Sequence, residues 1–218
     1  AGENVDRESM AVEEQDRTRM TEVLKQAKQK GMKTVVLLNI SGPVEMADWL
    51  PYADAVLCIF IPGCMGGVAA ARLLTGLAEP GGRLPVTFPI RYEDTPAYPN
   101  FPGEGNDAYY GEGVFVGYRY YDTYNKAVDY PFGFGLSYAT FEVSDVKAVK
   151  TGACTATVSA VVKNTSNVDA AETVQVYVAP GKADVARPKH ELKGFKKVFL
   201  KAGESAEVSF DLDDRAFA

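Results

Sequence analysis

Few side chains in this sequence could support metal or thiol chemistry. There is one histidine, His190, and there are three cysteines, Cys58, Cys64 and Cys154. A single histidine excludes a metal site built from several histidines, and the cysteines lack the CxxC spacing of zinc and redox motifs. A Ser-His-Asp triad would have to use His190. Because that histidine lies in a polar turn before a predicted strand, we interpret it as a surface residue.

The cysteines are interpreted as structural thiols. Cys58 lies in an apolar run and Cys154 in an alternating one, where a free cysteine behaves as a small hydrophobic side chain. Free thiols favour a cytoplasmic location, and a periplasmic or secreted location stays open.

The net charge argues against a nucleic-acid partner, and the length of the apolar runs argues against a membrane-spanning helix. The formal net charge is −6, whereas a nucleic-acid-binding protein shows a clustered basic face. No apolar run approaches the roughly 20 residues of a membrane helix. The glycine-rich turn at residues 63–67 could hold a phosphate on helix amides, but no lysine or Ser/Thr follows it. We therefore interpret the turn as tight packing and expect no metal, nucleotide or redox cofactor.

Aromatic side chains are concentrated between residues 109 and 121. Such rings could stack on the apolar face of a sugar, or pack between domains, and the sequence favours neither interpretation. Tyr109 and Tyr110 are candidate substrate contacts on the first interpretation. Glu104 and Glu112 lie in the same segment and are candidates for the rim of an active site, but we rank neither above a solvated loop residue. The aromatic residues are Tyr109, Tyr110, Phe115, Tyr118, Tyr120 and Tyr121.

The first third of the chain alternates helix and strand patterns. Residues 13–30, 44–50 and 66–76 are predicted to be helices. Residues 34–40 and 55–61 are continuous apolar runs, which predict strands buried on both faces of a sheet. Strand, helix, strand and helix with short turns predict a parallel sheet flanked by helices, which we assign to an α/β domain over residues 1–90.

The pattern changes twice after residue 90. Residues 91–140 are rich in proline, glycine and tyrosine and predict an irregular connection, which is usually functional at such a length. Residues 141–218 contain five short alternating segments and predict an antiparallel, all-β sandwich. A fibronectin-type sandwich has about seven strands, so we expect this domain to be incomplete at its C-terminal end.

Two motifs carry a resemblance to a known family. They are GGRLPVTFP at residues 81–89 and YPFGFGLSY at residues 130–138. Together they resemble the C-terminal half of glycoside hydrolase family 3, the β-glucosidase family. Further matches follow the family order at residues 39–44, 62–67, 111–121 and 191–195. The resemblance implies an α/β sandwich followed by a fibronectin type III-like domain, both following a barrel that this chain lacks.

The resemblance also implies catalytic roles. Residues 1–7, AGENVDR, are similar to the segment in which the family places its general acid/base glutamate before an Asp-Arg pair, so Glu3 is the candidate acid/base. Arg7 is a candidate for orienting the loop that carries Glu3. The family's nucleophile is an aspartate on the barrel, often followed by tryptophan. Asp48 and Trp49 form that dipeptide, but they lie in the predicted helix of the α/β segment, so we expect no nucleophile here.

From these inferences we predict that the chain is part of a retaining, exo-acting β-glycosidase. Its most favoured activity is that of a β-glucosidase. Its substrate would be a terminal β-D-glucosyl residue of a glucoside or oligosaccharide. Its partner would be the barrel-bearing polypeptide of the same enzyme, and homo-oligomerisation is left open. One alternative is a non-catalytic scaffold or a carbohydrate- or partner-binding module. A nucleotide-binding α/β protein is the other, and the missing lysine after the glycine-rich turn argues against it.

Overall fold

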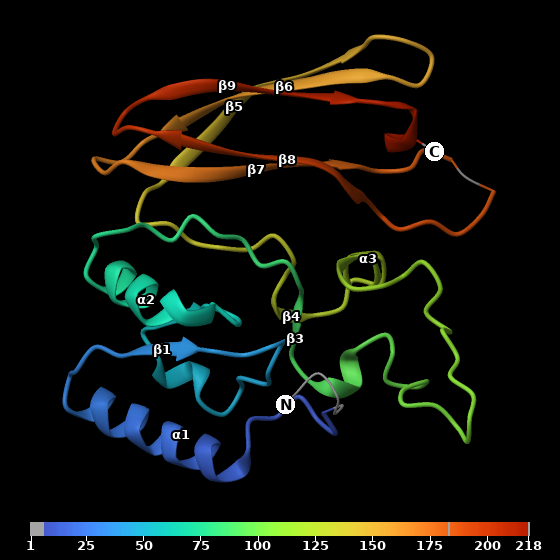
Figure 1. Cartoon of the computed structure of the whole chain (residues 1–218). Coiled ribbons are helices and arrows are strands. Elements are labelled where there is room, and N and C mark those ends of the chain that lie inside the picture. Colours follow the sequence, from blue (N-terminus) through green and yellow to red (C-terminus); the bar gives the residue numbers. More distant parts are fainter. Residues whose placement is uncertain (1–6, 183, 218) are drawn as a thin grey trace.

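The computed structural model describes residues 7–182 and 184–217, which form an α/β unit, a long connection and a β-sandwich stacked on both (Figure 1). The helices are α1 (Glu14–Gln29), α2 (Gly66–Leu74) and α3 (Tyr118–Thr123). Single 3-10 turns are η1 (Leu50–Tyr52), η2 (Gly63–Met65), η3 (Tyr92–Asp94) and η4 (Asp214–Ala216). The strands are β1 (Val35–Leu38), β2 (Ala55–Cys58), β3 (Phe88–Pro89), β4 (Val128–Tyr130), β5 (Phe141–Lys150), β6 (Ala156–Asn164), β7 (Ala170–Val178), β8 (Glu191–Leu200) and β9 (Ser205–Leu212).

Helix α1 confirms the first predicted helix within one residue at each end. Glu14 and Asp16 lie in its first turn and Lys28 in its last, which complements the helix dipole. The chain leaves the helix through Gly31, whose φ of 66° is readily adopted by glycine. Leu24 is the buried contact of α1 with the sheet.

Strands β1 and β2 pair in parallel, as the helix and strand alternation predicts. The expectation that β1 is buried on both faces is wrong. Val36 and Leu38 are buried against α1, whereas Val35 and Leu37 on the other face are 48% and 44% exposed. Because side chains alternate along a strand, one whole apolar face of β1 is open in this chain.

The helix predicted at residues 44–50 is a turn that ends in η1. The carbonyl of Met46 accepts hydrogen bonds from the amides of Trp49 (3.2 Å) and Leu50 (2.8 Å), and no longer helix forms. Met46 and Trp49 are both buried, so their spacing of three residues reports a shared core contact and not a continuing helix. Asp48 points outward and pairs with Arg17 at 3.4 Å.

The C-terminal unit has the five antiparallel strands that the sequence predicts. They form a three-stranded sheet, β5-β6-β9, and a two-stranded sheet, β7-β8. Val162, Val208 and Leu200 are almost completely buried between them. The unit is therefore a small β-sandwich with its own apolar core.

The connection at residues 91–140 is more regular than expected. It contains η3, α3 and β4, and β4 pairs antiparallel with β3. Tyr121 of α3 is 5% exposed, and burial is the main cause that raises its pKa to about 12. Buried aromatic rings thus give order to a segment whose glycines and prolines hide any regular period.

The two motifs at residues 81–89 and 130–138 pair with each other. The Leu84 amide donates to the Phe134 carbonyl and the Gly133 amide to the Leu84 carbonyl, both at 2.8 Å. Gly135 is required by this pairing, since a Cβ there would lie 2.4 Å from the Gly82 carbonyl oxygen. The motifs are therefore structural parts of the fold.

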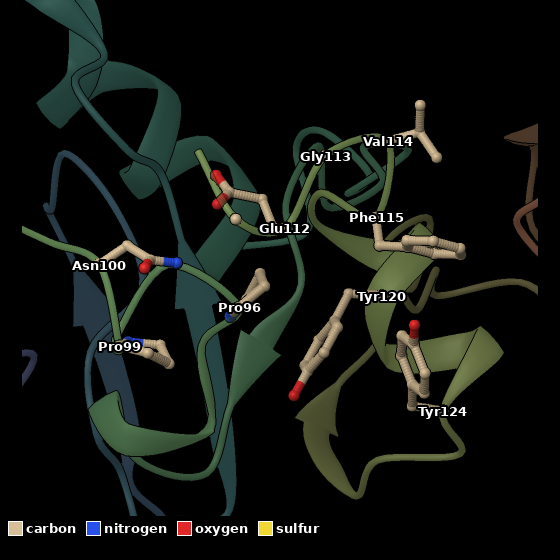
Figure 2. Close-up of a pocket in the computed structure, with 10 residues that line it drawn as sticks. Pro96, Pro99, Asn100, Glu112, Gly113, Val114, Phe115, Tyr120 and Tyr124 are labelled. Carbon is tan, nitrogen blue, oxygen red and sulfur yellow. The ribbon is translucent and has the colours of Figure 1, made fainter. Parts of the chain in front are cut away.

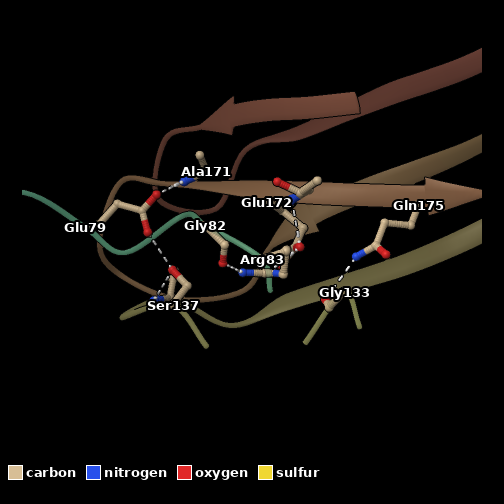
Figure 3. A network of polar contacts seen from close by, with 10 residues as sticks. Glu79, Gly82, Arg83, Gly133, Ser137, Ala171, Glu172 and Gln175 are labelled. Carbon is tan, nitrogen blue, oxygen red and sulfur yellow. Dashed lines mark hydrogen bonds and ion pairs between the residues drawn. The ribbon is translucent and has the colours of Figure 1, made fainter. Parts of the chain in front are cut away.

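Polar contacts join these paired motifs to β7 of the sandwich (Figure 3). Glu79 accepts hydrogen bonds from the Ala171 amide at 2.8 Å and from the Ser137 hydroxyl at 2.9 Å. Arg83 pairs with Glu172. Because these groups are partly or fully buried, they fix how the sandwich sits on the α/β unit.

Candidate functional site

The carboxyl end of β1 is where this fold would hold a ligand, because open α/β sheets bind ligands beyond the carboxyl ends of their strands. Arg7 donates from its guanidinium to the Pro43 carbonyl at 3.0 Å, and the Glu45 amide donates to the Met10 carbonyl at 3.0 Å. These two bonds hold residues 7–10 against the loop that follows β1. Glu3 lies outside the described residues, so its predicted role stays a prediction.

Glu45 ties a second segment to this edge. Its carboxylate accepts a hydrogen bond from the Tyr92 amide at 3.0 Å, and the Tyr92 ring packs edge-on against Tyr98 at 5.0 Å. The start of the connection is thereby fixed beside the segment that carries Arg7. This tie was not predicted, because Glu45 lies in a stretch whose local pattern is helical.

The predicted substrate contacts Tyr109 and Tyr110 are solvent-facing. They are 64% and 83% exposed, and among the described residues neither ring packs on another aromatic side chain. The structure does not bring them onto Arg7. Their proposed contact with a substrate stays a prediction.

A pocket that the sequence did not predict lies within the connection (Figure 2). It is an open depression with a volume of about 510 Å³. Asn100 and Pro96 lie on one side, and Phe115, Tyr120 and Tyr124 lie on the other. The ten lining residues are Pro96, Pro99, Asn100, Gly111, Glu112, Gly113, Val114, Phe115, Tyr120 and Tyr124.

Glu112 gives this pocket its only carboxylate among the lining residues. Its Oε2 atom is buried and has no hydrogen-bond partner in the described part of the chain. The interpretation of Glu112 as a solvated loop residue is therefore wrong. One wall of the pocket did have a signal in the sequence. Tyr120 and Tyr124 are four residues apart, a spacing that brings side chains together on a helix, and their ring centroids lie 5.2 Å apart at α3.

His190 is an interface residue and not the surface residue that the sequence suggested. Its Nε2 atom lies 2.9 Å from a carboxylate oxygen of Asp122. The imidazole stacks with the Tyr118 ring at 6.2 Å and meets the Tyr177 ring edge-on at 5.1 Å. His190 thus joins α3 to the sandwich and has a structural role.

The cysteines have mixed environments. Cys58 is half-buried, and burial raises the pKa of its thiol, in keeping with a structural role. Cys64 and Cys154 are exposed, so the small-hydrophobe interpretation of Cys154 is wrong and the interpretation of Cys64 as a structural thiol gains no support. Across residues 7–182 and 184–217, no three His, Cys, Asp or Glu side chains are grouped to hold a metal ion. No helix in the same residues is long and apolar enough to cross a membrane.

Comparisons with known proteins agree on one family. Residues 1–138 match the glycosyl hydrolase family 3 C-terminal domain, and residues 172–218 match the fibronectin type III-like domain. The chain is similar to the crystal structure of a GH3 beta-glucosidase from Bifidobacterium adolescentis. That similarity has 55% identity and a TM-score of 0.93, and it covers 99% of this chain and 32% of the other.

Two curated relatives differ in their activity. An exo-alpha-(1->6)-L-arabinopyranosidase from Bifidobacterium breve is 58% identical over 90% of this chain and 26% of its own length. Thermostable beta-glucosidase B from Acetivibrio thermocellus is 44% identical over 99% of this chain and 28% of its own length. The chain therefore spans little more than a quarter of each of these relatives.

Proposed function

Because the chain belongs to glycoside hydrolase family 3, we propose that it is the C-terminal part of a retaining, exo-acting β-glycosidase. The single observation that carries this proposal is the match over residues 1–138, which includes the segment with Glu3. The leading activity is that of a β-glucosidase, which removes terminal non-reducing β-D-glucosyl residues.

Glu3 is the general acid/base in this proposal. Retaining glycosidases use two carboxyl groups about 5–5.5 Å apart, one of which protonates the leaving oxygen and later activates water. Arg7 supports the assignment, because it is four residues from Glu3 and is fixed to the Pro43 carbonyl at the carboxyl end of β1. The role of Arg7 is thus to position the loop that carries the acid.

The nucleophile comes from a barrel-bearing polypeptide of the same enzyme. Within this chain, the Asp48–Trp49 dipeptide serves another purpose, since Trp49 is completely buried in the core and Asp48 pairs with Arg17. The greater length of the relatives leaves ample room for a barrel. The attacking carboxylate would form a covalent glycosyl intermediate on that polypeptide, while Glu3 transfers protons.

A second candidate activity is that of an exo-α-(1→6)-L-arabinopyranosidase. The observation that favours it is the 58% identity to the Bifidobacterium breve enzyme, against 44% to the Acetivibrio thermocellus β-glucosidase. Both activities need an acid and a nucleophile, so Glu3 keeps its role in either case. The glycone pocket that separates the two sugars would be built mainly by the barrel.

The test uses the full-length enzyme that contains this chain. We expect faster release of p-nitrophenol from the β-D-glucopyranoside than from the α-L-arabinopyranoside, measured as kcat/KM. Proton NMR during the reaction should show the first-formed sugar with the same anomeric configuration as the substrate. A faster arabinopyranoside reaction would select the second candidate, and an inverted product would reject the retaining mechanism.

A further inference from the structure

Glu45 lies in the loop of residues 39–45, which follows β1, and has no part in the mechanism proposed above. Its carboxylate accepts a hydrogen bond from the Tyr92 amide at 3.0 Å. We infer that Glu45 is a positioning residue for the general acid, because it steadies the loop to which the segment after Glu3 is bound. This inference rests on the proposed function, in which Glu3 is that acid.

The loop supports the anchor segment, which we define as residues 7–10. The Arg7 guanidinium donates to the Pro43 carbonyl and the Glu45 amide donates to the Met10 carbonyl, both at 3.0 Å. Met10 is 6% exposed, so burial also holds the far end of the anchor segment in place. A shift of the loop would therefore pass directly to the anchor segment.

The loop has few supports of its own. Val44 and Met46 are buried in the core and fix its C-terminal end. Besides the two bonds to the anchor segment, one hydrogen bond in the described part of the chain joins the loop to another segment, and it runs from the Tyr92 amide to Glu45. The carboxylate of Glu45 is thus the side chain that ties this loop to the rest of the fold.

The segment on the other side of this bond is firmly held. Tyr92 begins η3, and the first amide of a helical turn has no acceptor within the turn, so the Glu45 carboxylate satisfies it from outside. The Tyr92 ring packs edge-on against Tyr98 at 5.0 Å, and the preceding strand β3 consists of the buried residues Phe88 and Pro89. The loop is therefore tied to a point that the core itself fixes.

Arg91 precedes Tyr92 and is an alternative partner for the carboxylate of Glu45. Its guanidinium donates instead to Asp94, from Nε at 3.3 Å and from Nη2 at 3.2 Å. The carboxylate of Glu45 is bound to a backbone amide, so its role is that of a hydrogen-bond acceptor. The amide oxygen of a glutamine can supply the same acceptor.

Steady-state kinetics of the full-length enzyme test the inference with an alkyl glycoside and a 2,4-dinitrophenyl glycoside of its preferred sugar. We expect Glu45→Ala to lower kcat/KM about tenfold for the alkyl glycoside, because a misplaced acid protonates the leaving oxygen poorly. The loss should be much smaller for the dinitrophenyl glycoside, which needs little protonation. Glu45→Gln keeps an acceptor and should retain most of the activity on both substrates.

Glu93→Ala changes an exposed glutamate beside Tyr92 and should behave as the parent does. If Glu45→Ala does not fold, Glu45→Asp, whose carboxylate is one methylene shorter, replaces it under the same criteria. The inference is overturned if Glu45→Ala loses equally on both substrates or not at all, or if Glu45→Gln loses as much as Glu45→Ala.

Glu3→Ala in the same assay separates the two possible failures. A selective loss for Glu3→Ala without one for Glu45→Ala would overturn only the role of Glu45 and spare the proposed function. Near-normal rates for Glu3→Ala on both substrates would overturn the proposed acid, and the role of Glu45 with it.

Discussion

Asn164 shows how one residue's role can differ from what its sequence context suggests. It begins the sequence Asn164-Thr165-Ser166, which fits a glycosylation motif, yet its side chain is completely buried. Its amide donates to the carbonyls of Val168 (2.8 Å) and Leu200 (3.2 Å), and its oxygen accepts from the Ser166 amide and hydroxyl. The residue therefore holds the end of β6 to β8 and to the turn at Val168, and its buried side chain is closed to a glycan in the folded chain.

Replacing Asn164 should destabilise the sandwich strongly. Asn164→Ala would leave two carbonyls and one amide without their partner, and we expect a loss of about 3 kcal/mol in the free energy of unfolding. Asn167→Ala, three residues away and exposed, is the control and should change little. Calorimetric unfolding measures both. Equal stability of the two variants would show that the network of Asn164 contributes nothing.

Asp129 makes the stability of the chain depend on pH. One of its carboxylate oxygens is buried without a partner among the described residues, and burial raises its pKa above the ordinary value of 3.8. The folded state then holds this proton more tightly than the unfolded state, so the free energy of unfolding falls as the pH rises from below 3.8 through the folded-state pKa.

Asp129→Asn should remove this part of the pH dependence. The variant should melt at a higher temperature than the parent at neutral pH, and the gap should close in acid, where Asp129 is protonated in both states. Melting curves between pH 3 and pH 7 give the measurement, with the exposed Asp184→Asn as the control. A gap that stays constant across this range would reject the titration of Asp129 as the cause.

At the scale of elements, the sequence predicted most of the helices and strands that have a clear local pattern of apolar side chains. The amphipathic α1, the parallel pair β1-β2 and the five sandwich strands are all confirmed. The failures come from contacts between distant residues. Met46 and Trp49 are spaced like helix neighbours but meet in the core, and α3 is ordered by the burial of Tyr121. Single-sequence patterns do not record such contacts.

The bridge from the α/β unit to β7 depends on Glu79. Glu79→Ala would leave the Ala171 amide buried without an acceptor, and we expect a loss of about 1–3 kcal/mol in the free energy of unfolding. Glu79→Gln retains an acceptor and should lose less. The exposed strand residue Glu142→Ala is the control. If Glu79→Ala and Glu142→Ala melt at the same temperature, Glu79 does not hold the two units together.

At the scale of the whole molecule, one surface of the α/β unit exposes many large apolar side chains. Large apolar side chains are exposed along the open face of β1 and along α2 and its flanking turns. Large exposed apolar patches are uncommon on monomeric proteins and mark interaction surfaces. We propose that the remainder of the enzyme packs here. The exposed residues are Val35, Leu37, Ile61, Met65, Val68, Leu74 and Leu77.

The candidate site was only partly predictable. The motif resemblance named Glu3 and Arg7 as candidates, and the tie of Arg7 to Pro43 adds an anchor that no local pattern contains. The pocket at Glu112 was missed, because its walls come from segments about 25 residues apart that meet only in three dimensions. A candidate residue on a recognisable motif can be named from sequence, whereas a cavity built from distant segments cannot.

The most direct test of the account is the leaving-group dependence of Glu3→Ala in the full-length enzyme. We predict that kcat/KM falls by about 10²-fold or more for glucosides with poor leaving groups, because protonation of the leaving oxygen is lost. The loss should be much smaller for activated aryl glucosides, which need little protonation. The exposed Glu8→Ala is the matched control and should behave as the parent does. Near-normal rates for Glu3→Ala on both kinds of substrate would contradict the assignment of Glu3 as the general acid/base.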